Sequence, residues 1–265
     1  MVEALPQPVR LRLEQALGQF RHWSEAPAAS PIPVAVLEGG RSNTSVLVEY
    51  ESRRWVVRID GKNPASLGIS RSAEWRALNI AAQEALAPTP AYQNPDLGAL
   101  VCEYCEPTEP NSWNIADVAE LLRGIHALPP IRFRLDPIDR ARRYLNLAGG
   151  GEPANAFIDA CQRLSHYPHT LCHNDLLQAN RLFSKGRLLA IDWEYVAMGD
   201  PYFDLAVIIE GDALDQSESG ELLRAWQQSE PGEEDQQRLA DNRLVYRELT
   251  HLWEQVYEAS PGDVG

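Results

Sequence analysis

Three oxygen-bearing side chains in one segment have the types and spacing that phosphoryl transfer requires. Asp175 lies two residues after His173, Asn180 follows five residues after Asp175, and Asp192 ends an apolar stretch further along the chain. Transfer of a phosphoryl group to an alcohol needs a carboxylate that orients the attacking hydroxyl and accepts its proton. It also needs hard oxygen ligands that hold Mg²⁺ on the phosphates. We therefore predict Asp175 as the base and Asn180 and Asp192 as Mg²⁺ ligands.

The pattern His173-x-Asp175-Leu-x-x-x-Asn180 has the spacing of a kinase catalytic loop. Each residue alone has an ordinary alternative, because Asp and Asn often form turns or caps and a strand often ends in a carboxylate. Their combination across a predicted loop, hairpin and second loop favours the catalytic interpretation. We expect His173 to hold the loop by hydrogen bonding.

The elements that must position these side chains follow from the hydrophobic pattern. Residues 34–59 are rich in β-branched and aromatic types with short turns, and 99–107 predict a further strand. Two short apolar runs around Ser184-Lys185-Gly186 predict a hairpin. Helical spacing predicts four helices, at 3–22, 70–87, 111–128 and 237–259. We predict an α+β fold with two lobes, a β-rich lobe at 1–105 and a mainly helical lobe at 106–265.

Composition narrows the class of protein. The 265 residues include 24 Lys plus Arg and 38 Asp plus Glu, a net charge of −14, and 44% are apolar. This content supports a packed core and excludes a disordered acidic tail. The acidic surplus argues against nucleic acid and anionic membranes as partners and favours a neutral or cationic small ligand. Neither a membrane-spanning apolar run nor a secretory signal is recognisable, so we expect a cytoplasmic protein.

Cys102 and Cys105 form a C-x-x-C pair, which raises the question of a metal or redox site. A structural zinc site needs two further closely spaced ligands, and Cys161 and Cys172 do not supply a second pair. Residues three apart on a strand also point to opposite faces. We interpret the cysteines as reduced thiols.

Residues 171–206 closely resemble the characteristic segment of the aminoglycoside phosphotransferase and choline kinase superfamily. The family pattern is H-x-D-x-x-x-x-N, then I-D-W/F-E, then G-D-P-x-x-D-L-A, and this chain has CHNDLLQANRLF, AIDWEY and MGDPYFDLA. The form I-D-W-E-Y is most similar to bacterial choline kinases and thiamine kinases. The resemblance is highly specific here and weaker over the rest of the chain, where LLRGIHAL in the helix at 111–128 matches L-x-x-L-H-x-L. It implies a protein-kinase-like fold and the use of ATP and Mg²⁺.

The resemblance further implies that the first lobe binds the nucleotide. The phosphate-covering loop would lie within 37–50, and its binding groups would come from Gly39, Gly40, Ser42, Asn43 and Thr44. Arg58 stands where such kinases usually carry a lysine on the phosphates, and Glu74 is its expected ion-pair partner. The hinge that would hydrogen-bond adenine through its main chain falls at Glu103, Tyr104 and Cys105.

Aromatic residues beside Asp192 and in later helices are candidates for the substrate pocket. Trp193, Glu194 and Tyr195 follow Asp192 directly. Aromatic faces near carboxylates suit a quaternary ammonium or a thiazolium, although aromatic residues at helical spacing also pack cores. Further candidates are Tyr202, Trp226, Tyr246, Trp253 and Tyr257. We expect Asp204 to brace the catalytic loop.

These observations predict an ATP- and Mg²⁺-dependent kinase that phosphorylates a hydroxyl of a small cationic metabolite, with choline first and thiamine second. The partner is then a small-molecule alcohol, and the oligomeric state stays open. Three alternatives remain: an aminoglycoside phosphotransferase, a non-catalytic pseudokinase that acts as a binding module, and a metal-dependent hydrolase. The hydrolase would be built on His173, Asp175 and Asp192 and would normally need more clustered histidines.

Overall fold

The computed structural model describes residues 4–23, 29–38, 42–61, 64–108 and 114–259. They form two compact units, Met1–Ala65 with Pro88–Glu106 and Ser66–Ala87 with Pro107–Pro261. The predicted division at 105 and 106 differs from this grouping chiefly at 66–87, which precedes two strands of the first unit in sequence but belongs to the second unit. Each unit is described by itself.

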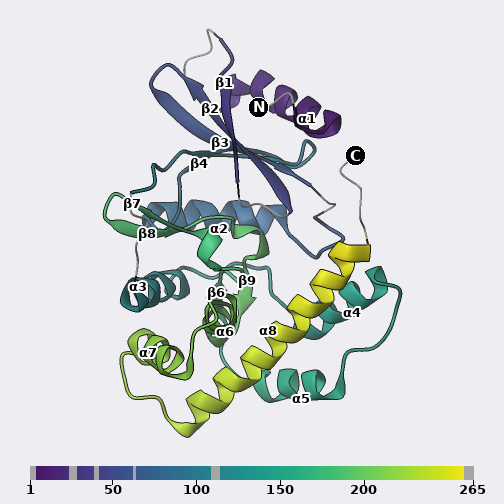
Figure 1. The fold of residues 1–265 in the computed structure, drawn as a ribbon, viewed down its shortest axis with the longest axis vertical. Coiled ribbons are helices and arrows are strands. Elements are labelled where there is room, and N and C mark those ends of the chain that lie inside the picture. Colours follow the sequence, from purple (N-terminus) through teal and green to yellow (C-terminus); the bar gives the residue numbers. More distant parts are fainter. Residues whose placement is uncertain (1–3, 24–28, 39–41, 62–63, 109–113, 260–265) are drawn as a thin grey trace. The chain divides into compact units, whose positions relative to one another are not determined.

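The first unit is a five-stranded antiparallel sheet with the order β1-β2-β3-β5-β4. Helix α1 packs on one face of it (Figure 1). Alternate residues of the central strand, Trp55, Val57 and Ile59, are buried with Leu13 of α1, because successive strand side chains point to opposite faces. The elements are α1 (Gln7–Gly18), β1 (Ile32–Leu37), β2 (Asn43–Tyr50), β3 (Arg53–Asp60), β4 (Pro90–Asn94) and β5 (Ala99–Glu103), with a 3₁₀ turn η2 (Phe20–His22).

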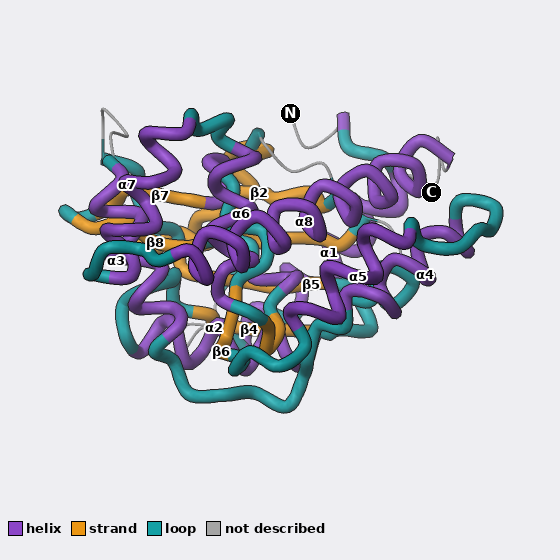
Figure 2. The backbone as a smooth tube through the Cα atoms, turned by 90° about the horizontal axis from the view of Figure 1, so that it is seen from below, coloured by secondary structure: helices purple, strands orange, loops and turns teal. Residues whose placement is uncertain are grey.

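The second unit is mainly helical, and α6 lies at its centre. Every residue of α6 from Pro201 to Ile209 is buried, as expected of a helix surrounded by other elements. Helix α8 runs along α4, α5 and α6 (Figure 2). The helices are α2 (Arg71–Gln83), α3 (Ile115–His126), α4 (Pro137–Leu147), α5 (Asn155–Leu164), α6 (Pro201–Gly211), α7 (Gln216–Gln227) and α8 (Glu233–Ala259).

Two small ladders in the second unit carry the catalytic segment. Strand β6 (Thr170–Cys172) pairs with β9 (Ala197–Gly199), and β7 (Arg181–Ser184) pairs with β8 (Arg187–Ala190). The second ladder is the predicted hairpin, and its turn residues Lys185 and Gly186 have φ of 52° and 79°. Two 3₁₀ turns, η3 (Gln178–Asn180) and η4 (Trp193–Tyr195), adjoin these strands.

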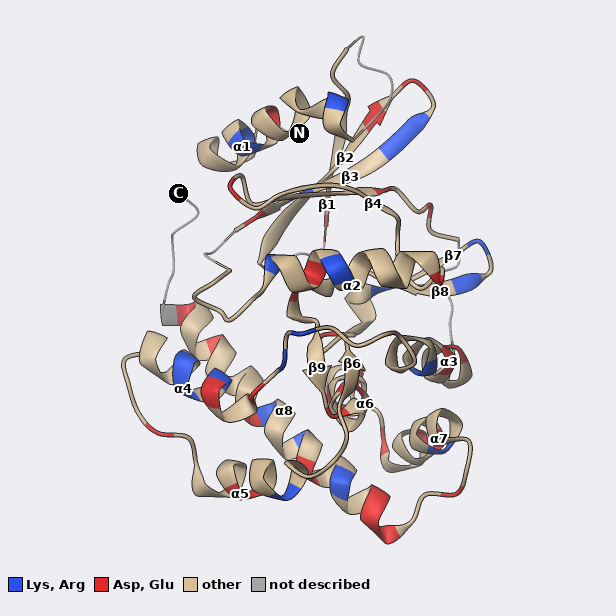
Figure 3. Ribbon diagram, turned by 180° about the vertical axis from the view of Figure 1, so that it is seen from behind, with Lys and Arg blue, Asp and Glu red and all other residues tan. Residues whose placement is uncertain are grey.

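Helix boundaries follow local chemistry. Helix α3 begins at a capping box of Asn114 and Asp117. Helix α2 ends four residues earlier than predicted, at Gln83, because Ala85 takes φ of 56° and the Leu86 N–H donates to the Ala81 carbonyl at 2.9 Å. Charged residues occur along the 27 residues of α8 (Figure 3). Among the described residues, no helix combines the length and apolar character needed to cross a bilayer.

Candidate active site

A buried carboxylate on α6 holds the backbone of the catalytic loop. The N–H groups of His173 and Asn174 donate to Oδ2 and Oδ1 of Asp204 at 2.9 and 2.6 Å. Asp204 has no exposed surface. Hydrogen bonds to an ionised acceptor are the strong ones, so this carboxylate fixes the direction of the loop immediately before Asp175, as the sequence predicts.

Behind Asp204, a hydrogen-bonded chain connects α3, α6 and α7. The ring of His126 lies with Nε2 at 3.1 Å from Asp204 Oδ2, and the Trp226 indole N–H donates to His126 Nδ1 at 3.0 Å. Because Nδ1 accepts this bond, Nε2 carries the proton and donates to Asp204, which makes the imidazole neutral. The structure therefore gives Trp226, one of the candidate substrate aromatics, a bracing role.

His126, Cys172 and Asp204 have potential ligand atoms within 4.8 Å of one another. Burial and the nearby Asp204 charge hold the pKa of the Cys172 thiol well above its ordinary value, so the sulfur keeps its proton. Asp204 already accepts bonds from two backbone amides and from His126. This cluster is better suited to bracing than to metal binding.

His173 is a structural residue of the loop. Its side chain is fully buried, and burial lowers its pKa to about 4. The ring Nε2 donates to the Ile191 carbonyl at 3.1 Å, and the Trp193 ring packs against it at 4.9 Å between centroids. This placement agrees with the expected bracing role and removes the basis for a hydrolase centred on His173.

Two residues of the site adopt left-handed backbone conformations. Asn174 has φ of 64° and Asp192 has φ of 59°, and Asn and Asp are the residues other than glycine that tolerate this region best. The Asn174 amide donates to the Cys172 and Tyr195 carbonyls at 3.2 and 3.0 Å, joining the loop to the segment after Asp192. Sequence reasoning missed this role of Asn174, although an Asn beside the motif Asp is a recognisable signal for a turn.

The structure brings the three predicted catalytic residues together. The Asn180 amide nitrogen donates to the Asp175 carbonyl at 2.8 Å and to Asp175 Oδ2 at 2.9 Å. The Ile191 N–H donates to the Asn180 carbonyl at 2.9 Å, which places Asp192, the next residue, beside Asn180. The hairpin β7–β8 thus brings Asp192 back to the loop that contains Asp175 and Asn180.

The charge around Asp175 is strongly negative. Burial and the charges of Asp192 and Glu194 hold the pKa of Asp175 well above its ordinary value, and the Asn180 hydrogen bond opposes this shift in part. A divalent cation would relieve the repulsion between these carboxylates.

The donor set fits Mg²⁺. Asp192 offers carboxylate oxygens, and in the described part of the chain the side-chain oxygen of Asn180 accepts no hydrogen bond. Hard oxygen ligands are the ones Mg²⁺ prefers.

Arg71 of α2 links two buried acids of the second unit. Its Nη1 lies 2.7 Å from Glu74 Oε2, and its Nη2 lies 3.2 Å from Glu194 Oε2. Glu194 is 3% exposed and ion-paired, which corrects the expectation that it faces a cationic substrate. The predicted pairing of Glu74 with Arg58 stays a prediction. Arg71 was missed, although its position three residues before Glu74 on a predicted helix is a signal for such a pair.

The predicted substrate aromatics divide into two groups. Trp193 is 1% exposed and its indole N–H donates to the Ala190 carbonyl at 2.9 Å, so it is a packing residue and no substrate contact. Tyr202 is buried, and Tyr246 packs against the Phe203 ring.

Tyr195, Trp253 and Tyr257 form the second group, which we call the α8 aromatic cluster. The Trp253 indole donates to the Tyr195 hydroxyl at 3.0 Å, and the Trp253 and Tyr257 rings stack at 5.3 Å. All three side chains are half-buried.

The predicted phosphate-binding residues lie in the first unit. Arg58 of β3 is 6% exposed, and its Nη2 lies 3.7 Å from Asp60 Oδ1. Asn43 begins β2 opposite Asp60, whereas Gly39 and Gly40 lie outside the described residues. A Cβ at Gly61 would come 2.1 Å from the Ser42 carbonyl oxygen, so only glycine fits where the two strands approach. Sequence reasoning missed Gly61.

The predicted hinge follows β5 in the first unit. The N–H groups of Glu103 and Tyr104 donate to the carbonyls of Thr89 and Arg54 at 2.8 and 3.0 Å. The Glu103 carboxylate lies 3.6 Å from Arg53 and is exposed. These two main-chain donors are therefore engaged within the unit, and adenine recognition at the hinge, including Cys105, stays a prediction.

Asp175 is in hydrogen-bond contact with Asn180 and lies near a second aspartate, Asp192. This arrangement on these elements is typical of a small-molecule kinase of the protein-kinase-like class. Comparisons with known proteins agree with this class. Residues 33–249 match the Phosphotransferase enzyme family, and the chain belongs to that family.

Two relatives and one solved structure illustrate the similarity. The protein LicA of Haemophilus influenzae is 27% identical over 256 residues, covering 83% of this chain and 72% of LicA. A thiamine kinase of Escherichia coli is 27% identical over 187 residues, covering 66% of this chain and 65% of that protein. The choline kinase LicA of Streptococcus pneumoniae has a TM-score of 0.76 at 23% identity, covering 96% of this chain and 92% of that one. The predicted fold class and the predicted class of small-molecule kinase are confirmed.

Proposed function

We propose that this kinase transfers the γ-phosphate of ATP to a hydroxyl of a small cationic metabolite, with choline as the first candidate and thiamine as the second. The observation that carries the chemistry is the pair Asp175 and Asn180, with the amide nitrogen 2.9 Å from one carboxylate oxygen. A carboxylate held in one orientation by an amide is suited to align an acceptor hydroxyl and take its proton.

Asp175 accepts a hydrogen bond from the acceptor hydroxyl and takes the proton as the oxygen attacks the γ-phosphorus. The bond between the γ-phosphorus and the β,γ-bridging oxygen breaks, and ADP leaves. The raised pKa of Asp175 makes it a stronger base than an exposed aspartate. Asn180 and Asp192 would hold Mg²⁺, which would supply neutralisation of charge on the phosphate oxygens. Asp204 acts through the loop backbone and keeps Asp175 in place. Arg58 binds the nucleotide phosphates.

The α8 aromatic cluster supports a cationic acceptor. Aromatic ring faces attract cations, as the Arg140 guanidinium 5.7 Å from the centre of the Tyr195 ring illustrates, and an acidic environment around Asp175 adds to that attraction. The similarity to the choline kinase LicA of Streptococcus pneumoniae and to thiamine kinase favours choline and thiamine. Because Glu194 is paired with Arg71, we assign recognition of the cation to the aromatic rings and to no single carboxylate.

The test is an acceptor panel of choline, ethanolamine, thiamine and kanamycin with ATP and Mg²⁺, with product identified by mass spectrometry. We expect phosphocholine, and we expect Trp253→Leu to raise KM for choline by about 10-fold, the loss of one good cation–π contact, with kcat nearly unchanged. Trp226→Leu is the matched control, since its indole braces His126, and should lower kcat instead. Phosphorylation of kanamycin alone would replace the proposal with an aminoglycoside kinase.

A further inference from the structure

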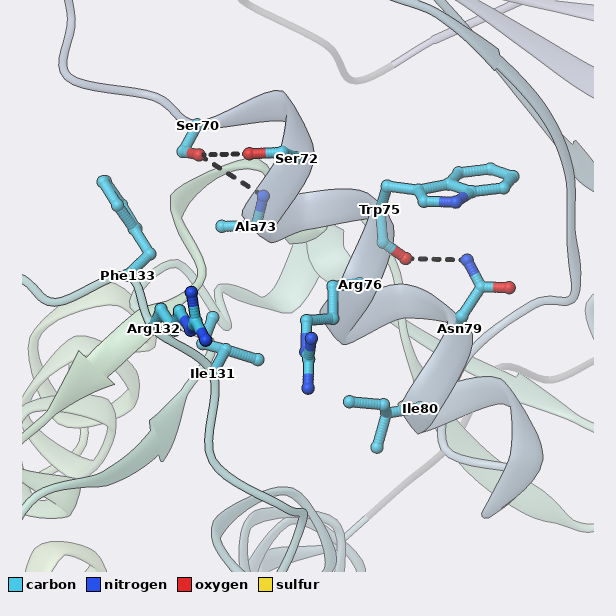
Figure 4. Close-up of a pocket in the computed structure, with 10 residues that line it drawn as sticks. All are labelled: Ser70, Ser72, Ala73, Trp75, Arg76, Asn79, Ile80, Ile131, Arg132 and Phe133. Atoms are coloured by element: carbon cyan, nitrogen blue, oxygen red, sulfur yellow. Dashed lines mark hydrogen bonds between the residues drawn. The ribbon is translucent and has the colours of Figure 1, made fainter.

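A cavity of about 780 Å³ lies between α2 and residues 131–133. One wall is α2 from Ser70 to Ile80, and the other is the segment 131–133 that follows α3 (Figure 4). Both walls belong to the second unit. None of the residues proposed for catalysis or Mg²⁺ binding lines it. We call it the α2 cavity.

Each wall of the α2 cavity carries one arginine. Arg76 comes from the helix and Arg132 from the facing segment (Figure 4), and both side chains are exposed. In the part of the chain that the structure describes, neither guanidinium forms a hydrogen bond or an ion pair. Elsewhere the arginines are often paired, as in Arg163–Asp241, Arg181–Asp212 and Arg238–Asp200.

Two uncompensated guanidinium groups at one cavity are unexpected in a chain with a net charge of −14. Guanidinium groups bind phosphate and carboxylate groups through paired hydrogen bonds. The Ser72 hydroxyl on the cavity wall, which is hydrogen-bonded to the Ser70 hydroxyl at 3.2 Å (Figure 4), is a further polar group there. The charge of the cavity is thus complementary to an anion.

The rest of the lining is mainly apolar, with Ser70 and Asn79 as its other polar residues. Ile80, Ile131 and Phe133 line the cavity beside the two arginines. A cavity of this volume lies within the range for small-molecule sites, about 300–1,000 Å³, in which apolar lining with a few polar groups is typical. We propose that the α2 cavity binds an organic anion, with an apolar body against Ile131 and Phe133 and a phosphate or carboxylate group between Arg76 and Arg132.

A ligand bound in the α2 cavity should affect the active site through Arg71. Ser70 and Ser72 line the cavity and flank Arg71 in sequence, and Ser70 caps α2 by accepting from the Ala73 N–H at 3.3 Å. Arg71 in turn binds Glu194, two residues after Asp192. A ligand that draws the first turn of α2 toward the cavity changes this ion pair, and we expect it to change kcat.

The binding test is titration calorimetry with 1-naphthyl phosphate, in the presence of Mg²⁺ and a non-hydrolysable ATP analogue that fills the nucleotide site. We expect one site per chain and an affinity at least about 10-fold lower in the double variant Arg76→Glu, Arg132→Glu. The matched control is Lys185→Glu, Arg187→Glu, which makes the same charge change at exposed positions of the β7–β8 hairpin. It should bind like the wild type.

Comparison ligands separate the sources of binding. 1-Naphthoate tests the carboxylate form, inorganic phosphate tests the anion alone, and 1-naphthol tests the apolar body alone. Equal binding by naphthol, equal loss in both double variants, or absence of binding by both naphthyl anions would overturn the site. If an anion binds and kcat at saturating ATP and acceptor is unchanged, the coupling through Arg71 is overturned. All the binding measurements are independent of the acceptor's identity.

Discussion

Asp204 and Asp175 lie in the same unit, close to the same loop, in opposite electrostatic environments. Asp204 is fully buried and accepts hydrogen bonds from two backbone amides and from His126. Asp175 keeps some exposure, has the Asn180 amide as its side-chain donor, and lies near Asp192 and Glu194.

The contrast separates support from chemistry. A carboxylate saturated with donors is stabilised as an anion and fixes the backbone, whereas one that faces other carboxylates is raised in free energy until a cation or a proton arrives. The unfavourable electrostatic environment is concentrated at Asp175, the residue proposed to react, and Asp204 has the structural role.

Replacing the reactive carboxylate has the largest expected effect. Asp175→Asn should lower kcat by about 1,000-fold, because the base is lost. It should also raise Tm. A carboxyl whose pKa is raised by folding destabilises the folded state above that pKa, so removing its charge stabilises the protein at pH 7.5. Steady-state kinetics and thermal unfolding of the same preparation measure both effects. Full activity, or a lower Tm with weakened nucleotide binding, would contradict the comparison.

The supporting carboxylate should behave in the opposite way. Asp204→Asn replaces one acceptor oxygen with a donor, so one loop amide or His126 loses its partner. We expect the free energy of unfolding to fall by about 3 kcal/mol, measured by urea denaturation, and kcat to fall with it. Asp159→Asn on the exposed surface of α5 is the matched control and should change neither quantity. A higher free energy of unfolding for Asp204→Asn than for the wild type would contradict the distinction drawn between Asp204 and Asp175.

The buried ring of His173 predicts a pH effect of similar size. Its pKa is about 4 in the folded protein and near 6.5 when unfolded, so the unfolded chain binds the proton more readily between these values. The free energy of unfolding should therefore decrease as pH falls from 6.5 to 4, by about 3 kcal/mol in total. His173→Gln should flatten this decrease, while His166→Gln, at an exposed position, should keep it. Equal slopes in both variants would assign the pH effect to other groups.

The hydrogen bond from Trp226 to His126, which lies farthest from Asp175 in the series that supports the loop, gives the smallest expected effect. Trp226→Phe keeps the ring but removes the N–H that donates to His126. We expect the free energy of unfolding to drop by about 1 kcal/mol and kcat to fall a few-fold, with KM for ATP unchanged. Trp75→Phe on α2 is a control for the loss of an indole. A rise in KM without a change in kcat would argue for direct substrate contact by Trp226.

Local patterns in the sequence were sufficient for much of the fold. The capped helix α3, the hairpin around Lys185 and the helical C-terminal segment all have periodicity and boundary residues that report local structure. Strand β4 was missed because it begins with a proline, which an edge strand tolerates. The early end of α2 depends on the left-handed conformation of Ala85, which its residue type does not indicate.

For the site too, local patterns in the sequence predict only what depends on nearby residues. The spacing of Asp175, Asn180 and Asp192 is a local signal, and these residues do come together. The Arg71–Glu194 pair joins residues 123 apart, and the Trp226–His126 bond joins residues 100 apart. Such contacts arise from tertiary packing of α2, α3 and α7, which no spacing rule reports. For that reason aromatic type alone could not decide between a substrate contact and a bracing role for Trp226.

The pH dependence of kcat/KM for the acceptor tests the central claim most directly. If Asp175 is the base, the acid limb reports its pKa, which burial raises above the ordinary aspartate value of 3.8. The charges of Asp192 and Glu194 raise it further to the extent that bound Mg²⁺ does not compensate them. Glu194→Gln should move that limb to lower pH, since it removes a negative charge from the surroundings of Asp175. An acid limb at the ordinary value, unmoved by Glu194→Gln, would contradict the account.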